Sequence, residues 1–127
     1  MAFFDEGIYD PLTGALAPKF FYESSKRLIS WANRTNRQTS VIAIRHENLS
    51  DDELIKCATD LNSELRGGDL LARMNQKTFV LLLIGDQLGA EQLIFRLKNV
   101  VKFNLEFKSI ELNQGEDIVA ALARLGV

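Results

Sequence analysis

The stretch from residue 65 to residue 84, LRGGDLLARMNQKTFVLLLI, constrains the fold more than any other part of the sequence. An apolar run at residues 70–74 is followed by three polar residues, Asn75, Gln76 and Lys77, and then by a second apolar run at residues 78–84. Two such runs joined by a short polar tip predict a β-hairpin. The second run is apolar at nearly every position, which is typical of a central strand covered on both faces. We therefore expect this hairpin to form the middle of the sheet.

The segments on either side of the hairpin predict the rest of the fold. Apolar residues recur at helical spacing in four segments, residues 18–32, 50–65, 90–101 and 118–125. Ser50 and Glu53 form a capping box at the start of the second helix, and we expect Gly67 to end it. Further strands are predicted at residues 40–44 and 103–107. After the leading helix the order is β-α-β-β-α-β. This order predicts an α+β, ferredoxin-like fold with an antiparallel sheet and helices on one face.

Composition and charge exclude several classes of protein. With 127 residues, of which 46% are hydrophobic, the chain is predicted to form one domain over residues 1–127. Its formal charge is -2 with acids and bases interspersed, so we expect neither a nucleic acid nor a membrane as partner. The N-terminus lacks the features of a signal peptide, and the longest apolar run, residues 79–84, is far short of the roughly 20 residues of a membrane helix. Cys57 stands alone, which favours an inert thiol in a cytoplasmic protein.

Three pieces of the chain together resemble the GGDEF domain of diguanylate cyclases, a bacterial signalling family. Residues 10–14, DPLTG, followed by Phe20 and Phe21, are similar to the D-x-L-T-G opening of that family. Residues 66–73, RGGDLLAR, are similar to its R-x-x-D-x-x-A-R run. Residues 75–79 occupy the position of the signature itself, where only Phe79 matches. The resemblance covers about residues 9–125 in matching element order and implies a shortened form of the GGDEF fold.

The resemblance also implies a catalytic site that this chain does not complete. In the family, GTP phosphates and two metal ions meet at the hairpin tip, where carboxylates hold the metal ions. Here Arg45 stands at the expected position of the aspartate that ends the first strand, and Lys77 and Thr78 replace the acids of the signature. Glu47 is the one nearby carboxylate, which is too few for a two-metal centre. We therefore expect no bound metal and no cofactor.

Three further features of the family's catalytic site are missing. Asn75 and Gln76 replace the two signature glycines, so their side chains fill space that the nucleotide needs. Asn75 accepts a left-handed turn conformation more readily than Gln76 does. The segment from Arg45 to Arg66 has only 22 residues, without the guanine-reading Asn and Asp of the family, and Ala17-Pro18 replaces the Asn-Arg pair expected after the opening motif. The sequence predicts that the domain is not an enzyme.

A second site of the family is matched better. In many members the R-x-x-D run binds the product, cyclic di-GMP, and an Arg on the helix after the hairpin completes the site. Arg66 and Asp69 match the run, and Arg96 falls near the third position. An Arg fork can stack on a base and bind a phosphate with two hydrogen bonds. In the alternative interpretation, Arg66 lies in the last turn of a helix, where its charge interacts favourably with the helix dipole. Gly67 and Gly68 then form an ordinary turn, and Arg96 is a solvated charge.

Two hypotheses follow from different classes of function. The first is a non-catalytic GGDEF-like receptor or adaptor that binds cyclic di-GMP at Arg66, Asp69 and Arg96. The second is a ligand-free module that docks a protein partner, which the sequence does not name, or forms a homodimer. Both hypotheses involve contacts with other proteins, and the binding of cyclic di-GMP separates them.

The remaining conspicuous residues carry weaker signals. His46 is the only histidine and has no Cys or His at ligand spacing, so a metal site is not expected. Trp31 and Tyr22 are expected in the core rather than on a stacking surface. Arg45, Arg73 and Lys77 are an alternative metal-free anion pocket at the hairpin tip, against the simpler interpretation of solvated charges.

Overall fold

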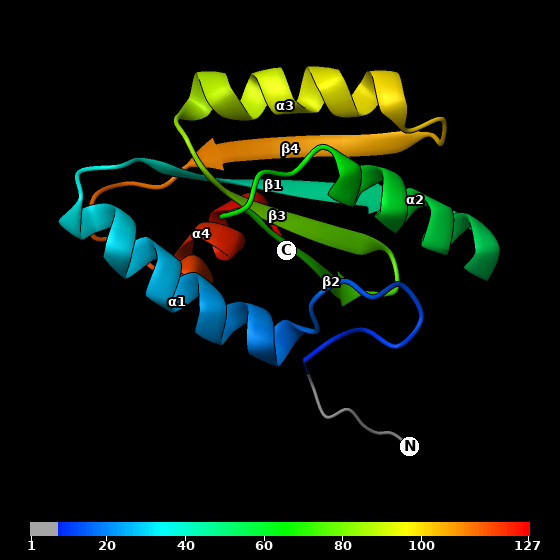
Figure 1. Cartoon of the computed structure of the whole chain (residues 1–127), viewed down its shortest axis with the longest axis horizontal. Coiled ribbons are helices and arrows are strands. Elements are labelled where there is room, and N and C mark those ends of the chain that lie inside the picture. The colour runs from blue at the N-terminus through cyan, green and yellow to red at the C-terminus, as the bar shows by residue number, and fades with distance from the viewer. Residues whose placement is uncertain (1–7) are drawn as a thin grey trace.

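The computed structural model of the chain describes residues 8–127, which form four helices and a four-stranded sheet (Figure 1). In chain order the elements are α1 (Pro18–Arg34), β1 (Thr39–His46), α2 (Asp51–Ser63), β2 (Leu70–Asn75), β3 (Thr78–Ile84), α3 (Gln87–Val100), β4 (Leu105–Glu111) and α4 (Ile118–Leu125). Each helix and strand predicted from the sequence is present, with shifts of a few residues at some ends.

The sheet has the strand order β2-β3-β1-β4, and all neighbouring strands are antiparallel. β3 pairs with β1 over residues 78–84 and with β2 on its other side, so β3 is a central strand. β2 lies at the edge of the sheet, so the prediction that the whole hairpin forms the middle of the sheet was correct only for β3. This topology confirms the ferredoxin-like prediction, because each βαβ unit of that fold leaves room for one antiparallel strand between its two parallel strands.

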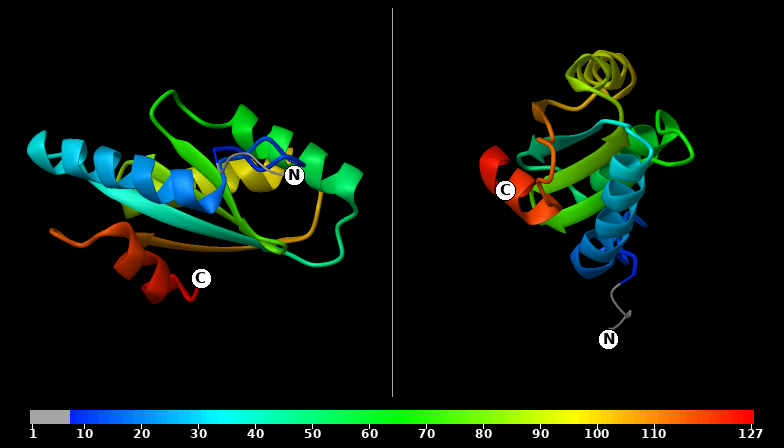
Figure 2. Two further views of the ribbon diagram at one scale, coloured as in Figure 1. Left: turned by 90° about the horizontal axis from the view of Figure 1, so that it is seen from below. Right: turned by 90° about the vertical axis from the view of Figure 1, so that its left-hand side faces the viewer.

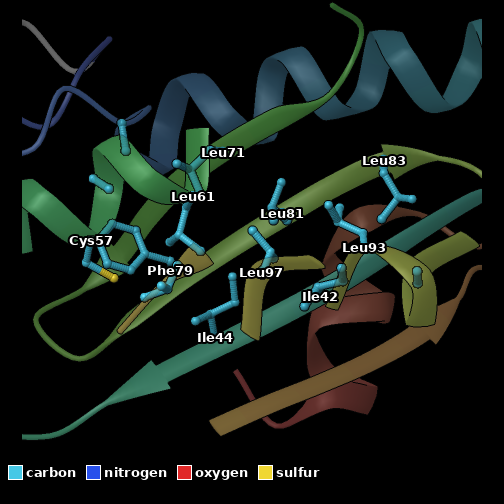
Figure 3. Packing of buried hydrophobic residues seen from close by; sticks show 14 of the residues in the cluster. Ile42, Ile44, Cys57, Leu61, Leu71, Phe79, Leu81, Leu83, Leu93 and Leu97 are labelled. Carbon is cyan, nitrogen blue, oxygen red and sulfur yellow. The ribbon is translucent and has the colours of Figure 1, made fainter. Parts of the chain in front are cut away.

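One face of the sheet is covered by α2 and α3, the two helices of the ferredoxin-like unit. Every second strand residue points to this face, including Ile42 and Ile44 of β1 and Phe79 and Leu81 of β3 (Figure 3). Leu61 of α2 packs against them and is fully buried. Alternation along the strands therefore builds the first half of the core.

The opposite face is covered by α1 and α4, which come from the two ends of the described chain (Figures 1 and 2). The alternate strand residues, such as Val41 and Leu82, pack here against Phe21 of α1 and Leu122 of α4. This covering explains why β3 is apolar at nearly every position, since both of its faces are buried. The sequence-based prediction described only one helical face, and the structure adds the second.

Helix ends show where the sequence signals were correct. The Ser50 side chain accepts a hydrogen bond from Glu53 N–H, and the Glu53 side chain accepts one from Ser50 N–H, which confirms the predicted capping box. The prediction that Gly67 ends this helix was wrong, because α2 ends at Ser63 and Glu64 is its C-cap. Within the described residues no helix has the length and apolar character needed to cross a membrane.

The two aromatic residues expected in the core lie at its edge. Tyr22 is 37% exposed and Trp31 is 39% exposed, and the guanidinium of Arg37 lies 5.8 Å from the Trp31 ring centroid. Their prediction as core residues was wrong because both project from the outer side of α1, while Phe21 and Ile29 occupy its inner side.

Candidate functional site

Arg66 and Asp69 bracket a tight turn at the open end of the hairpin, just before β2. Asp69 N–H donates to the Arg66 carbonyl oxygen at 3.1 Å, and Arg66 N–H donates to Asp69 Oδ2 at 3.0 Å. The other carboxylate oxygen of Asp69 accepts a hydrogen bond from Ile84 N–H at 3.4 Å. The carboxylate therefore holds the turn to the end of β3. Each carboxylate oxygen can accept more than one hydrogen bond, so Asp69 still has acceptor capacity for a ligand.

The conformation of this turn leaves the Arg66 side chain in solvent. A Cβ on Gly68 would come within 3.2 Å of Ile84 Cδ1, so the backbone at Gly68 approaches β3 closely, whereas Gly67 has nothing within 4 Å. Arg66 is exposed and makes no ion pair with any described residue. Because α2 ends at Ser63, Arg66 lies beyond the last turn of the helix. The alternative interpretation placed Arg66 at the end of a helix, and the structure instead places it two residues beyond the C-cap.

Arg96 lies at the same end of α2 as this turn. Its Nε is 3.4 Å from Oε1 of Glu64, which is the C-cap of α2 and precedes Arg66 by two residues. Arg96 is nine residues after Gln87, which places it about two and a half turns into α3. α3 begins three residues before residue 90, where the sequence predicted its start, so Arg96 lies farther into the helix than expected. The contact through Glu64 nevertheless brings Arg96 close to the Arg66 turn.

A cavity of about 370 Å³ adjoins the turn at Asp69, which is one of its lining residues. Its lining includes Gly14 of the loop before α1, Thr59 and Asn62 of α2, and Asp69. Thr59 and Asn62 were not predicted as site residues, because a polar residue on the outer side of a helix carries no sign of the cavity beside it. Asn62 directly precedes Ser63, the last residue of α2, and so lies close to the turn.

The hairpin tip is a turn of two residues, Gln76 and Lys77, between the paired residues Asn75 and Thr78. Asn75 Oδ1 accepts a hydrogen bond from Lys77 N–H at 2.9 Å and closes the turn. Neither Asn75 nor Gln76 has a positive φ, so the left-handed conformation considered for these positions is absent here. Both therefore occupy the tip without backbone strain.

Charges at the tip pair with one another. Glu47 accepts a hydrogen bond from Lys77 Nζ at 3.1 Å, and its other oxygen lies 3.8 Å from Arg45 Nε. The hydrogen bond from Lys77 is the main cause that lowers the pKa of Glu47. A divalent cation does not fit this arrangement, because two cationic side chains already share the one carboxylate. Among residues 8–127, no group of three His, Cys, Asp or Glu side chains is placed to hold a metal ion.

The alternative anion pocket at the tip was wrong, because its three cations are not left unpaired. Arg73 turns away from the tip and pairs with Asp10 at 3.3 Å. Asp10 also accepts hydrogen bonds from the backbone and hydroxyl of Thr13, at 3.0 and 2.7 Å. The opening motif therefore acts structurally, since it fastens the loop before α1 to β2.

Two titratable side chains, His46 and Cys57, are buried on the side of the sheet that α2 and α3 cover. His46 is 4% exposed, and burial, followed by the charge of Arg73, lowers its pKa. Cys57 is fully buried, and burial raises the pKa of its thiol to about 11. The thiol is therefore protonated at neutral pH, in agreement with the prediction of an inert cysteine.

Comparison with solved structures identifies the fold. The chain superimposes on the diguanylate cyclase SiaD from Pseudomonas aeruginosa, solved in complex with its activator SiaC, with a TM-score of 0.84 and 20% identity over 92% of this chain. The chain has the fold of a GGDEF domain. It spans 54% of the SiaD chain, which is about half of that protein.

Two further neighbours with this fold were solved with cyclic di-GMP. A microbial GGDEF domain matches with a TM-score of 0.83 and 16% identity, over 92% of this chain and 84% of that one. The GGDEF domain of DgcB from Caulobacter crescentus, in complex with cyclic di-GMP, matches with a TM-score of 0.81 and 11% identity, over 94% and 86% of the two chains. No family model matches the sequence. No curated protein matches it either. At these identities the likeness establishes the fold and not the activity.

Proposed function

We propose that this GGDEF-fold domain is a non-catalytic receptor for cyclic di-GMP, which binds at Arg66, Asp69 and Arg96. The observation that carries the proposal is the exposed Arg66 on a braced turn, with Arg96 held nearby through Glu64. Two planar guanidinium groups and a carboxylate match the chemistry of a guanine dinucleotide, which offers phosphates, base edges and base faces. Two neighbours of the same fold were solved with this ligand, which supports the choice.

We propose the absence of catalysis on separate grounds. The ion pairs of Lys77 and Arg45 with Glu47 leave no carboxylate for a metal ion, and phosphoryl transfer in this fold needs one at the hairpin tip. Purified protein with GTP and Mg²⁺ or Mn²⁺ should therefore form no cyclic di-GMP. Chromatography of the reaction mixture tests this, with a known cyclase as positive control. Product that disappears when Lys77 or Arg45 is substituted would refute it.

Calorimetric titration of cyclic di-GMP against the wild-type protein and Arg66→Ala tests the receptor. Loss of one charge-assisted contact is worth roughly 1.5–3 kcal/mol, so Arg66→Ala should weaken binding about ten- to a hundredfold. Its melting temperature should stay nearly unchanged, because the Arg66 side chain is exposed and the turn is held by backbone atoms and Asp69. Asp69→Ala should weaken binding too, but with some loss of stability, since its carboxylate holds the turn.

Lys77→Ala is the matched control, because it removes one exposed cation from a loop at the other end of the hairpin. Its binding should equal that of the wild type. If the wild-type protein ignores cyclic di-GMP at high micromolar concentration, the receptor proposal fails. A protein-docking module or a homodimer is then the better explanation, and the exposed Leu88 and Phe95 of α3 are the first residues to substitute.

A further inference from the structure

Glu64 occupies an unfavourable place for a carboxylate. As the C-cap of α2 it lies at the negative end of the helix dipole, where a cation is favoured. Within residues 8–127 its carboxylate forms an ion pair with Arg96. The Glu64 side chain is 24% exposed and that of Arg96 is 43% exposed, so solvent screens the pair. Helix stability therefore does not explain the carboxylate.

The charges around the turn sum to zero while Glu64 is present. Arg66 and Arg96 contribute two positive charges, and Asp69 and Glu64 contribute two negative ones. A cyclic dinucleotide brings two phosphodiester groups, each with one negative charge. The negative charge of Glu64 therefore repels the ligand. Glu64 also pairs with Nε of Arg96, so a phosphate has to compete with it for that guanidinium.

We propose that Glu64 is a built-in competitor that holds Arg96 away from an anionic ligand and so sets the affinity of the site. The inference rests on the proposed receptor function and adds a regulation of it. Binding of a cyclic dinucleotide exchanges the Glu64–Arg96 pair for a phosphate–Arg96 pair. Because Arg66 has no such partner among the described residues, it is the first contact of the ligand and Arg96 is the second.

The test is the affinity of Glu64→Gln for cyclic di-GMP, measured by calorimetry beside the wild type. Loss of a surface ion pair and of one repulsive charge should tighten binding about three- to tenfold. The matched control is Asp52→Asn, which removes the same charge from the exposed first turn at the other end of α2 and should leave the affinity unchanged. Equal or weaker binding by Glu64→Gln would show that Glu64 is inert or helps to position Arg96, and would overturn the inference.

A second measurement asks whether Glu64 acts through Arg96. In the Arg96→Ala background, the gain in affinity from Glu64→Gln should shrink to less than half of its value on a logarithmic scale. The reason is that Glu64 no longer has an Arg96 side chain to compete for. An undiminished gain would assign the whole effect to repulsion and overturn the competitor role. If neither the wild type nor Glu64→Gln binds the ligand, the receptor function itself fails. If the wild type binds and Glu64→Gln binds equally well, only the present inference fails.

Discussion

The side chain of His46 is buried on the α2–α3 face of the sheet, and within the described part of the chain it lacks hydrogen-bond partners. Neither ring nitrogen has a hydrogen-bond partner among residues 8–127, and Arg73 Nε nearby lacks one too. The ring packs 6.0 Å from that of Phe79, and the charged groups facing it are Arg73 of β2, Lys77 of the hairpin turn and Glu47 after β1. Because burial and two cations oppose a further positive charge, the fold holds His46 in its neutral form.

This state predicts how the stability depends on pH. The folded pKa of His46 is lowered while the unfolded pKa stays near 6.5, so the unfolded chain binds more protons as the pH falls below about 6.5. The melting temperature should therefore fall between about pH 7 and pH 5. His46→Phe should flatten this slope, because the chain has no other histidine and the lowered pKa of Glu116 and Glu47 acts at more acidic pH. Parallel slopes for the two proteins would contradict the assignment.

At the residue scale, the sequence predicted what motifs and charge alone determine. The spacing of Arg66 and Asp69 predicted that the two residues act together, and the structure joins them in one turn. The ion pairs of Arg45 and Lys77 with Glu47 were not predicted. Glu64 was not found, because its partner Arg96 is 32 residues away and belongs to a different helix. Contacts between distant elements leave no trace at the sequence positions that make them.

At the scale of elements, the largest errors are at the end of α2 and at the start of α3. The capping box correctly predicted the start of α2. At its other end the hydrogen bonds span three residues instead of four, from Glu64 N–H to the Leu61 carbonyl and from Leu65 N–H to the Asn62 carbonyl. The helix therefore ends before Gly67. The start of α3 was missed because Asp86 caps it through Gly89 N–H, and Gly89 is a poor helix former.

Truncation of a buried side chain should lower the free energy of unfolding by a similar amount on either face of the sheet. Leu61 packs on the α2–α3 face and Leu82 on the α1–α4 face, and both are fully buried. Leu61→Ala and Leu82→Ala should each lower the free energy of unfolding by about 2–5 kcal/mol in urea titrations. Val119→Ala on the outer side of α4, where Val119 is 62% exposed, should change it by less than about 0.5 kcal/mol. A loss below about 0.5 kcal/mol at both buried sites would show that the core is misplaced.

At the scale of the whole molecule, one sheet belongs to both halves of the core. β1 and β3 contribute residues to the α2–α3 face and to the α1–α4 face, so neither half keeps its strands if the other unfolds. We therefore expect a single cooperative transition for this domain.

Trp31 allows a direct test of this cooperativity. It is the only tryptophan and reports from α1, on the face opposite Leu61. Its fluorescence and the far-ultraviolet circular dichroism should give coincident urea transitions, and Leu61→Ala should shift both midpoints together. A fluorescence midpoint that stays in place while the dichroism moves would show that the two faces unfold independently.

The arrangement of α1 and α4 on one face also has a consequence for synthesis on the ribosome. β1, β2 and most of β3 have been synthesised once Leu82 has been added, but β4 and α4 come later, and Leu125 of α4 follows 43 residues after Leu82. At about 5–20 residues per second this interval lasts about 2–9 s. During that time the apolar side of the nascent sheet is covered by α1 alone. The growing chain therefore passes through a stage in which Val80 and Leu82 are open to other nascent chains or to a chaperone.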